Sequence, residues 1–210
     1  KPEPYKGKGF HYVDEVIRSS SDEEYSKKYL EDFLFRGTNM QHLVQGTVAG
    51  VTSITLDDVK KHYANFFGNS NMTIGIAGNY SADFLKKITT DLNGMPAAKS
   101  AIPEAGKGRQ PKDFEVEIVA KDNALGSAIF AGFPMDLTRS NDDFAALMVA
   151  NSWLGEHRKS YSRLYQKIRE QRSMNYGDYT YIEWYNNGGG NMLPRPGYPR
   201  SSNYFSIWLR

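Results

Sequence analysis

The chain has 210 residues, of which 40% are hydrophobic and 13% aromatic, so it is long and apolar enough to form one large domain or two small ones. Its 26 basic and 24 acidic residues give a net charge of +2, without the positive excess typical of nucleic-acid-binding proteins. The absence of cysteine excludes disulfides and thiol catalysis, and the longest apolar run, residues 144–150, is too short to span a bilayer.

Capping residues predict three helices in the first 94 residues. Residues 1–9 are rich in Pro, Gly and Lys and are expected to be a flexible lead-in, and the start without Met suggests a piece of a longer protein. The first helix follows the capping box of Ser21 and Glu24 and should end at Gly37. A second box, Thr55 and Asp58, begins a helix that ends at Gly68, and Ser81 caps a third, whose apolar face is Phe84, Leu85, Ile88 and Leu92.

Two stretches between these helices have other patterns. Residues 38–53 have no sustained period and are predicted to form a loop. Residues 71–78 are a short apolar run between turn residues, which predicts a buried strand.

Residues 94–113 hold three Pro and three Gly and no apolar face, so we place a linker at residues 95–113.

The second half alternates strand and helix patterns. Strands are expected at residues 114–121, 127–133, 176–185 and 204–210, with one helix capped by the run from Ser140 to Asp143, a second ending near Arg172, and a long polar loop before the last strand. Alternation in these strands predicts an α+β fold in which helices pack on one face of a mainly antiparallel sheet. A strand that reaches the last residue suggests a truncated domain.

The sequence lacks the common catalytic motifs. The four histidines, His11, His42, His62 and His157, are at least 20 residues apart, so no H-x-x-E-H zinc motif exists and we expect no metal site. Asp58 and His62, four residues apart on a helix, are expected to be a solvated pair. There is no G-x-S-x-G motif, and the glycines at 188–190 lack the Lys of a phosphate loop.

The most specific stretch is the helix-to-strand corner between residues 160 and 184. Its S-R-L-Y-Q-x-I-R-E-x-R-x-x-x-Y-G resembles the signature of the non-zinc homologous domain of the pitrilysin/insulinase family, with matches at Ser162, Arg163, Leu164, Arg169, Glu170, Arg172 and Tyr176. Two positions differ, because Ser173 stands where glycine is usual and Asn175 where alanine is usual. Residues 54–63, the run at 71–78 and the turn at 94–96 resemble the end of a homologous domain of the same family.

The resemblance implies a function. In that family, zinc is held by H-x-x-E-H and a distant Glu in one homologous domain, and the matching Arg and Tyr of the other donate hydrogen bonds to the peptide near the scissile bond. It therefore implies that Arg169 and Tyr176 are the catalytic residues, that peptide is the substrate, and that zinc belongs to the full-length parent and not to this chain. Residues 1–94 would be the C-terminal part of the zinc-type domain, and residues 114–210 would be the N-terminal part of the Arg/Tyr-bearing domain. Residues 95–113 would be the linker between them.

Alternatives remain open. The parent is either a zinc metalloendopeptidase, inactive as this piece alone, or a non-catalytic scaffold or partner subunit of the same fold; in both cases a zinc-bearing domain of the same or a partner chain is the expected partner. The two halves of the chain could dock with each other as a circularly permuted single domain. They could do so within one chain, or between chains in a domain-swapped homo-oligomer. A glycan- or nucleic-acid-binding tail, built from Tyr198, Tyr204, Trp208, Arg195 and Arg200, is a third hypothesis; we expect neither nucleic acid nor membrane as a partner, and the localisation stays unassigned.

Overall fold

The computed structural model describes residues 22–42, 46–120, 126–185 and 197–209. They form two compact units. Among the described residues, the first unit contains residues 47–104, and the second joins residues 22–42 and Gly46 to the chain from Ala105 onward. The change of unit at Glu104 and Ala105 lies inside the segment that the sequence predicts as a linker.

The first unit contains three helices, α3 (Val48–Ser53), α4 (Leu56–Phe66) and α5 (Ala82–Asn93), and a short 3₁₀ turn, η1 (Asn69–Asn71). The capping box of α4 forms as predicted: Thr55 Oγ1 accepts from Asp58 N at 3.2 Å, and Asp58 Oδ2 accepts from Thr55 N at 2.9 Å. Ser81 caps α5 by accepting from Phe84 N at 3.2 Å. These local signals therefore placed both helices correctly.

Two predictions in this region are wrong. Residues 48–53, predicted as loop, form α3, because Thr47 Oγ1 accepts from Gly50 N and caps a first turn. Residues 71–78 do not form a strand: Asn71 ends η1, and Met72 and Ile74 are exposed. A strand requires a neighbour to complete its hydrogen-bond ladder, and within the described residues no other segment pairs with this one.

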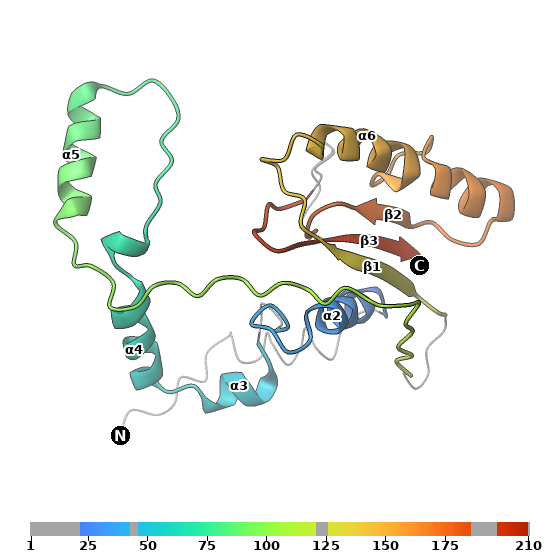
Figure 1. Ribbon diagram of the computed structural model, residues 1–210, viewed down its shortest axis with the longest axis horizontal. Coiled ribbons are helices and arrows are strands. Elements are labelled where there is room, and N and C mark those ends of the chain that lie inside the picture. Colours follow the sequence, from blue (N-terminus) through green and yellow to red (C-terminus); the bar gives the residue numbers. More distant parts are fainter. Residues whose placement is uncertain (1–21, 43–45, 121–125, 186–196, 210) are drawn as a thin grey trace. The chain divides into compact units, whose positions relative to one another are not determined.

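The second unit is built on a three-stranded antiparallel sheet (Figure 1). Its order is β1 (Ile129–Met135), β3 (Asn203–Leu209) and β2 (Asp178–Tyr181), so the last strand in sequence lies in the centre. β3 is buried on both faces, in contrast to an exposed edge strand. The predicted antiparallel sheet is therefore confirmed, although β2 covers only part of the predicted 176–185.

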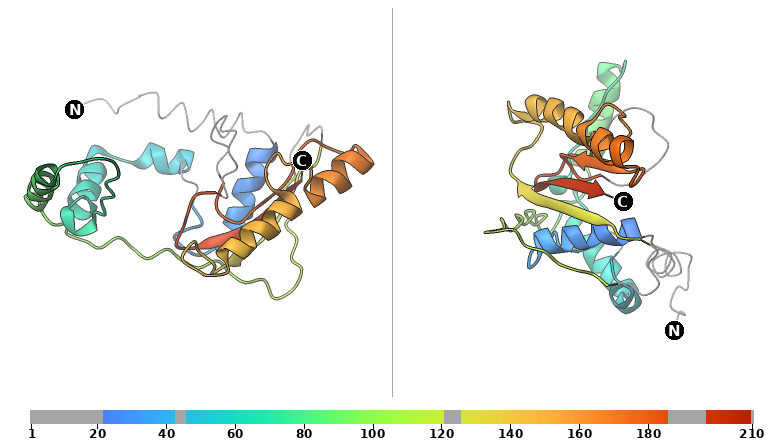
Figure 2. Two further views of the ribbon diagram at one scale, coloured as in Figure 1. Left: turned by 90° about the horizontal axis from the view of Figure 1, so that it is seen from above. Right: turned by 90° about the vertical axis from the view of Figure 1, so that its right-hand side faces the viewer.

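Helices cover the two faces of this sheet (Figure 2). On one face, α6 (Phe144–Gly155) packs through Phe144, Leu147 and Leu154 against Ile182 and Phe205. On the other face, α2 (Asp22–Phe35) packs through Leu30, Leu34 and Phe35 against Tyr204. The α+β class is confirmed, and the structure adds a second helical layer contributed by the beginning of the chain.

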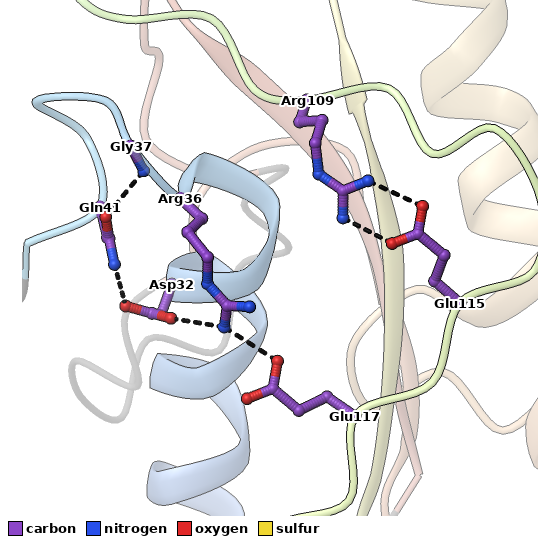
Figure 3. Close-up of polar contacts among 7 residues, drawn as sticks. All are labelled: Asp32, Arg36, Gly37, Gln41, Arg109, Glu115 and Glu117. Atoms are coloured by element: carbon purple, nitrogen blue, oxygen red, sulfur yellow. Dashed lines mark hydrogen bonds and ion pairs between the residues drawn. The ribbon is translucent and has the colours of Figure 1, made fainter.

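The predicted strand at 114–121 is wrong for the residues that the structure describes there. Residues 114–120 are extended without a ladder partner, and their apolar side chains Phe114, Val116 and Ile118 are exposed. The glutamates between them form ion pairs (Figure 3): Glu115 with Arg109 at 2.6 Å, and Glu117 with Arg36, the residue after α2, at 2.9 Å. This segment therefore makes exposed side-chain ion pairs where backbone pairing was expected.

Candidate functional site

The signature helix ends in a left-handed residue. The chain is helical from Arg163 to Arg172, with a π-helical stretch η2 (Tyr165–Glu170), which confirms the predicted end. Ser162 precedes it, and its buried Oγ has no hydrogen-bond partner among the described atoms, so this side chain does not cap the helix. Ser173 has a φ of +52°, and its N–H donates to Arg169 O at 2.8 Å. This backbone geometry favours glycine, which explains why glycine is usual at this position of the signature.

The left-handed turn brings the two predicted site residues together. The guanidinium carbon of Arg169 lies 4.4 Å from the ring centroid of Tyr176 and 4.7 Å from that of Tyr165, whose hydroxyl accepts a hydrogen bond from Arg169. Tyr176 is 78% exposed. An arginine held between aromatic rings keeps its charge and most of its five donors, and an exposed phenol beside it is a further donor. The corner can therefore bind an oxygen acceptor such as a peptide carbonyl.

Sequence reasoning did not single out Asp178, which begins β2 two residues after Tyr176. It is 1% exposed. Burial raises the pKa of this carboxyl, while the Asn175 side chain and the charge of Arg169 lower it. The signal available in the sequence was an acidic residue in a strand whose neighbours Thr180 and Ile182 are apolar or β-branched.

His157 lies in an aromatic cluster beside the sheet. Its Nδ1 is 2.6 Å from the Tyr181 hydroxyl, and its ring packs on those of Tyr179 and Tyr185. Burial, with the charges of Arg158 and Lys27, lowers its pKa from 6.5 to about 4. A neutral, packed imidazole of this kind is a structural element of the core.

The described residues do not fit a zinc site. No three side chains of His, Cys, Asp or Glu among them lie close enough together to hold a metal ion. The His62 ring packs on that of Phe66, with 4.9 Å between ring centroids, and the Asp58 carboxylate accepts a hydrogen bond from Thr55 N. Asp58 and His62 therefore contact other residues and not each other as expected. His11 lies outside the described residues.

Two aromatic rings of the tail are buried. Tyr204 and Trp208 are 4% and 3% exposed, and both belong to the core around β3. Arg200 pairs with Glu31 at 2.9 Å and lies over the Trp184 ring. These groups are therefore occupied within the fold, and Arg195 lies outside the described residues. In the part of the chain that the structure covers, no helix has the length and apolarity needed to cross a bilayer.

Comparison with known families identifies the fold. The sequence model described as "Peptidase M16 inactive domain" matches residues 53–194. The chain belongs to this family. The match includes the first unit from Ser53 onward and the Arg169–Tyr176 corner, and it confirms the predicted kinship with the insulinase-type peptidases.

Two curated relatives differ in their assigned chemistry. An uncharacterized zinc protease of Streptomyces coelicolor is 28% identical over 144 residues, which cover 66% of this M16 chain and 30% of that protein. The non-peptidase homolog YmxG of Helicobacter pylori is 29% identical over 166 residues, which cover 78% of this chain and 37% of that protein. The chain thus spans about a third of the length of these relatives.

A solved structure supports the fold. The peptidase M16 inactive domain from Pseudomonas fluorescens superposes with a TM-score of 0.66 at 20% identity, and covers 96% of this chain and 43% of that one. At this identity, the likeness concerns the fold alone.

Proposed function

We propose that this chain is a non-catalytic M16 module that holds a peptide for, or next to, a zinc-bearing M16 domain of the same or a partner chain. Three findings support the absence of a catalytic centre of its own: the matching family is described as inactive, one relative is named a non-peptidase homolog, and the described residues have no metal-binding cluster. In this proposal, residues 1–94 and 114–210 derive from two homologous domains joined by residues 95–113.

The observation that carries the peptide-holding role is the exposed Arg169–Tyr176 corner. The guanidinium carbon lies 4.4 Å from the centre of the Tyr176 ring, and this cation–π contact restricts the positions that the side chain takes before a ligand arrives. Pre-ordered donors bind a carbonyl without a further loss of side-chain freedom. A peptide carbonyl is therefore the ligand that suits this corner.

A second candidate is that the parent is a zinc metalloendopeptidase and that Arg169 and Tyr176 stabilise its transition state. The relative named a zinc protease favours it. The donors that bind a peptide carbonyl oxygen also bind the oxyanion, and they bind it more strongly as negative charge develops on this oxygen in the transition state. The two candidates therefore differ in whether turnover depends on the corner, not in what the corner contacts.

The test separates binding from turnover. Fluorescence anisotropy of a labelled decapeptide measures binding to the purified chain, and a quenched peptide substrate measures hydrolysis by the chain alone and after addition of a zinc-bearing M16 domain. We expect binding that weakens in Arg169→Ala and Tyr176→Phe, and no hydrolysis by the chain alone. Hydrolysis by the chain alone would overturn the non-catalytic role, and binding that both variants retain would remove the corner from the peptide site.

A further inference from the structure

Tyr165 and Arg169 stand four residues apart in η2, the π-helical stretch that leads into the corner. Side chains at this spacing lie one above the other on the same helix face. The guanidinium carbon of Arg169 is 4.7 Å from the centre of the Tyr165 ring, and Arg169 Nη1 donates a hydrogen bond to the Tyr165 hydroxyl. Tyr165 therefore contacts Arg169 both through its ring and through its hydroxyl.

The two tyrosines beside Arg169 differ in how firmly the fold holds them. Tyr176, whose ring centre is 4.4 Å from the guanidinium carbon, is 78% exposed, so packing restricts its ring little. Tyr165 is half-buried and lies inside a helical stretch. Burial and the helical backbone reduce the number of rotamers open to a tyrosine. Tyr165 is therefore the more rigid of the two contacts.

No ion pair takes over the task of holding Arg169. Within the described residues its guanidinium makes no ion pair with a carboxylate, whereas Arg139 and Arg200 each pair with a glutamate. An arginine side chain has many rotamers, and only specific contacts restrict it. A hydrogen bond is directional, so the Tyr165 hydroxyl fixes the Nη1 end of the guanidinium and leaves the other donors free.

We propose that Tyr165 is a positioning residue: its hydroxyl holds Arg169 Nη1, and the remaining N–H groups of the guanidinium are thereby directed toward a peptide carbonyl. The effect on peptide binding rests on the proposed function, whereas the position of the guanidinium is a property of the chain alone. Tyr165 acts through Arg169 and does not itself bind the peptide.

NMR of the full chain tests the positioning through rotation of the guanidinium about its Nε–Cζ bond. Tyr165→Phe removes the hydroxyl and keeps the ring, and Tyr80→Phe removes the hydroxyl of an exposed tyrosine in the first unit. The Arg169 signals are assigned by their absence in Arg169→Lys. Because a hydrogen bond at Nη1 slows the rotation, we expect it to be about fivefold faster in Tyr165→Phe and unchanged in Tyr80→Phe. A folded Tyr165→Phe protein with wild-type rotation overturns the proposal.

The wild-type chain provides a second test that depends on no variant at Tyr165. A guanidinium that is held at Nη1 rotates slowly, so its two Nη groups give separate nitrogen signals on cooling. A guanidinium that rotates freely gives one averaged signal. We expect separate signals for Arg169, and a single averaged signal under conditions that resolve those of Arg139 overturns the proposal.

Anisotropy of the labelled decapeptide on the same samples distinguishes this inference from the proposed function. Tyr165→Phe retains every donor of Arg169, so positioning predicts weaker peptide binding in this variant than in Tyr80→Phe, and equal binding would contradict the role in peptide binding. If Tyr165→Phe frees Arg169 but wild type binds no peptide, the proposed function fails and the positioning stands. If Arg169 rotates as in wild type, the positioning fails whatever the peptide does.

Discussion

The guanidinium carbon of Arg169 lies 4.4 Å from the centre of the Tyr176 ring, although Arg169 belongs to the last turn of a π-helical stretch and Tyr176 precedes a strand. The contact depends on the left-handed Ser173 between them, which turns the chain through the corner. Each side chain therefore limits the orientations open to the other, and a substitution at one should affect the function of both.

Arg169→Ala and Tyr176→Phe should lower peptide hydrolysis by an assembly of this chain with a zinc-bearing M16 domain, if the corner stabilises the transition state. Loss of one such donor typically lowers kcat about 100-fold, or about 3 kcal/mol. Because both would serve one transition state, the double variant should lose less than the sum of the single losses. kcat/KM, measured beside Tm, provides the check.

The matched control for this prediction is Tyr63→Phe, which removes an exposed phenol hydroxyl from α4. It should leave both kcat/KM and Tm unchanged. A Tyr176→Phe assembly that melts normally and cleaves at the wild-type rate would exclude Tyr176 from the site.

Ser173→Gly should stabilise the second unit. A non-glycine residue at φ +52° is strained by about 1 kcal/mol or more, and glycine would relieve this strain. Glycine also loses more conformational entropy on folding, which offsets part of the gain. The net gain should be about 0.5 kcal/mol, or 1–2 °C in Tm. Ser201→Gly, at an exposed residue whose φ is not positive, should give no gain, and an equal rise in both variants would contradict the role of the turn.

Arg139→Ala should destabilise the fold through Glu183. The Glu183 side chain is 1% exposed and accepts two hydrogen bonds of 2.8 Å from Arg139. Truncation leaves this carboxylate buried without its counter-charge, and since Arg139 is itself half exposed we expect a loss of about 2 kcal/mol, below that of a fully buried pair. Lys107→Ala breaks an exposed pair with Asp136 and should have almost no effect in urea unfolding; equal losses would contradict the argument.

The stability of the protein should fall as the pH drops from about 6.5 to about 4, partly through His157. Its folded pKa is lowered to about 4 by burial and by Arg158 and Lys27, while the unfolded chain is protonated near the ordinary value of 6.5. The unfolded state then binds more protons in this window, which favours unfolding as the pH falls. For this half-buried ring the effect is on the order of 1 kcal/mol.

His157→Phe isolates this contribution. The difference between urea midpoints at pH 7 and pH 4.5 should be smaller in this variant than in wild type. His62→Phe, at an exposed histidine of α4, should retain the wild-type difference. Identical pH dependence in all three proteins would mean that other groups are responsible.

Purified chain should contain no stoichiometric zinc after dialysis at neutral pH. The sequence has no cysteine, and its histidines are widely spaced. Elemental analysis measures the zinc content per chain in the purified protein. The measurement is repeated after excess zinc has been added and then removed by dialysis. One zinc retained per chain would reveal a site formed by distant residues.

Much of this protein follows from local sequence. Thr55 and Ser81 place two helices because a capping side chain satisfies backbone N–H groups of its own first turn. The residues around Arg169 and Tyr176 indicate the family because their spacing is itself a local pattern. Their meeting at one corner follows from the helix end and strand start that the period change predicts.

The strands depended on the tertiary structure. Residues 71–78 and 114–120 alternate or concentrate apolar side chains as β1 and β3 do, but only β1 and β3 have neighbours that complete their hydrogen bonds. The packing of α2 over Tyr204 joins residues far apart in the sequence, and no local pattern encodes it. Asp178 is the clearest case: the sequence shows an ordinary aspartate, and only the fold buries it at the start of β2.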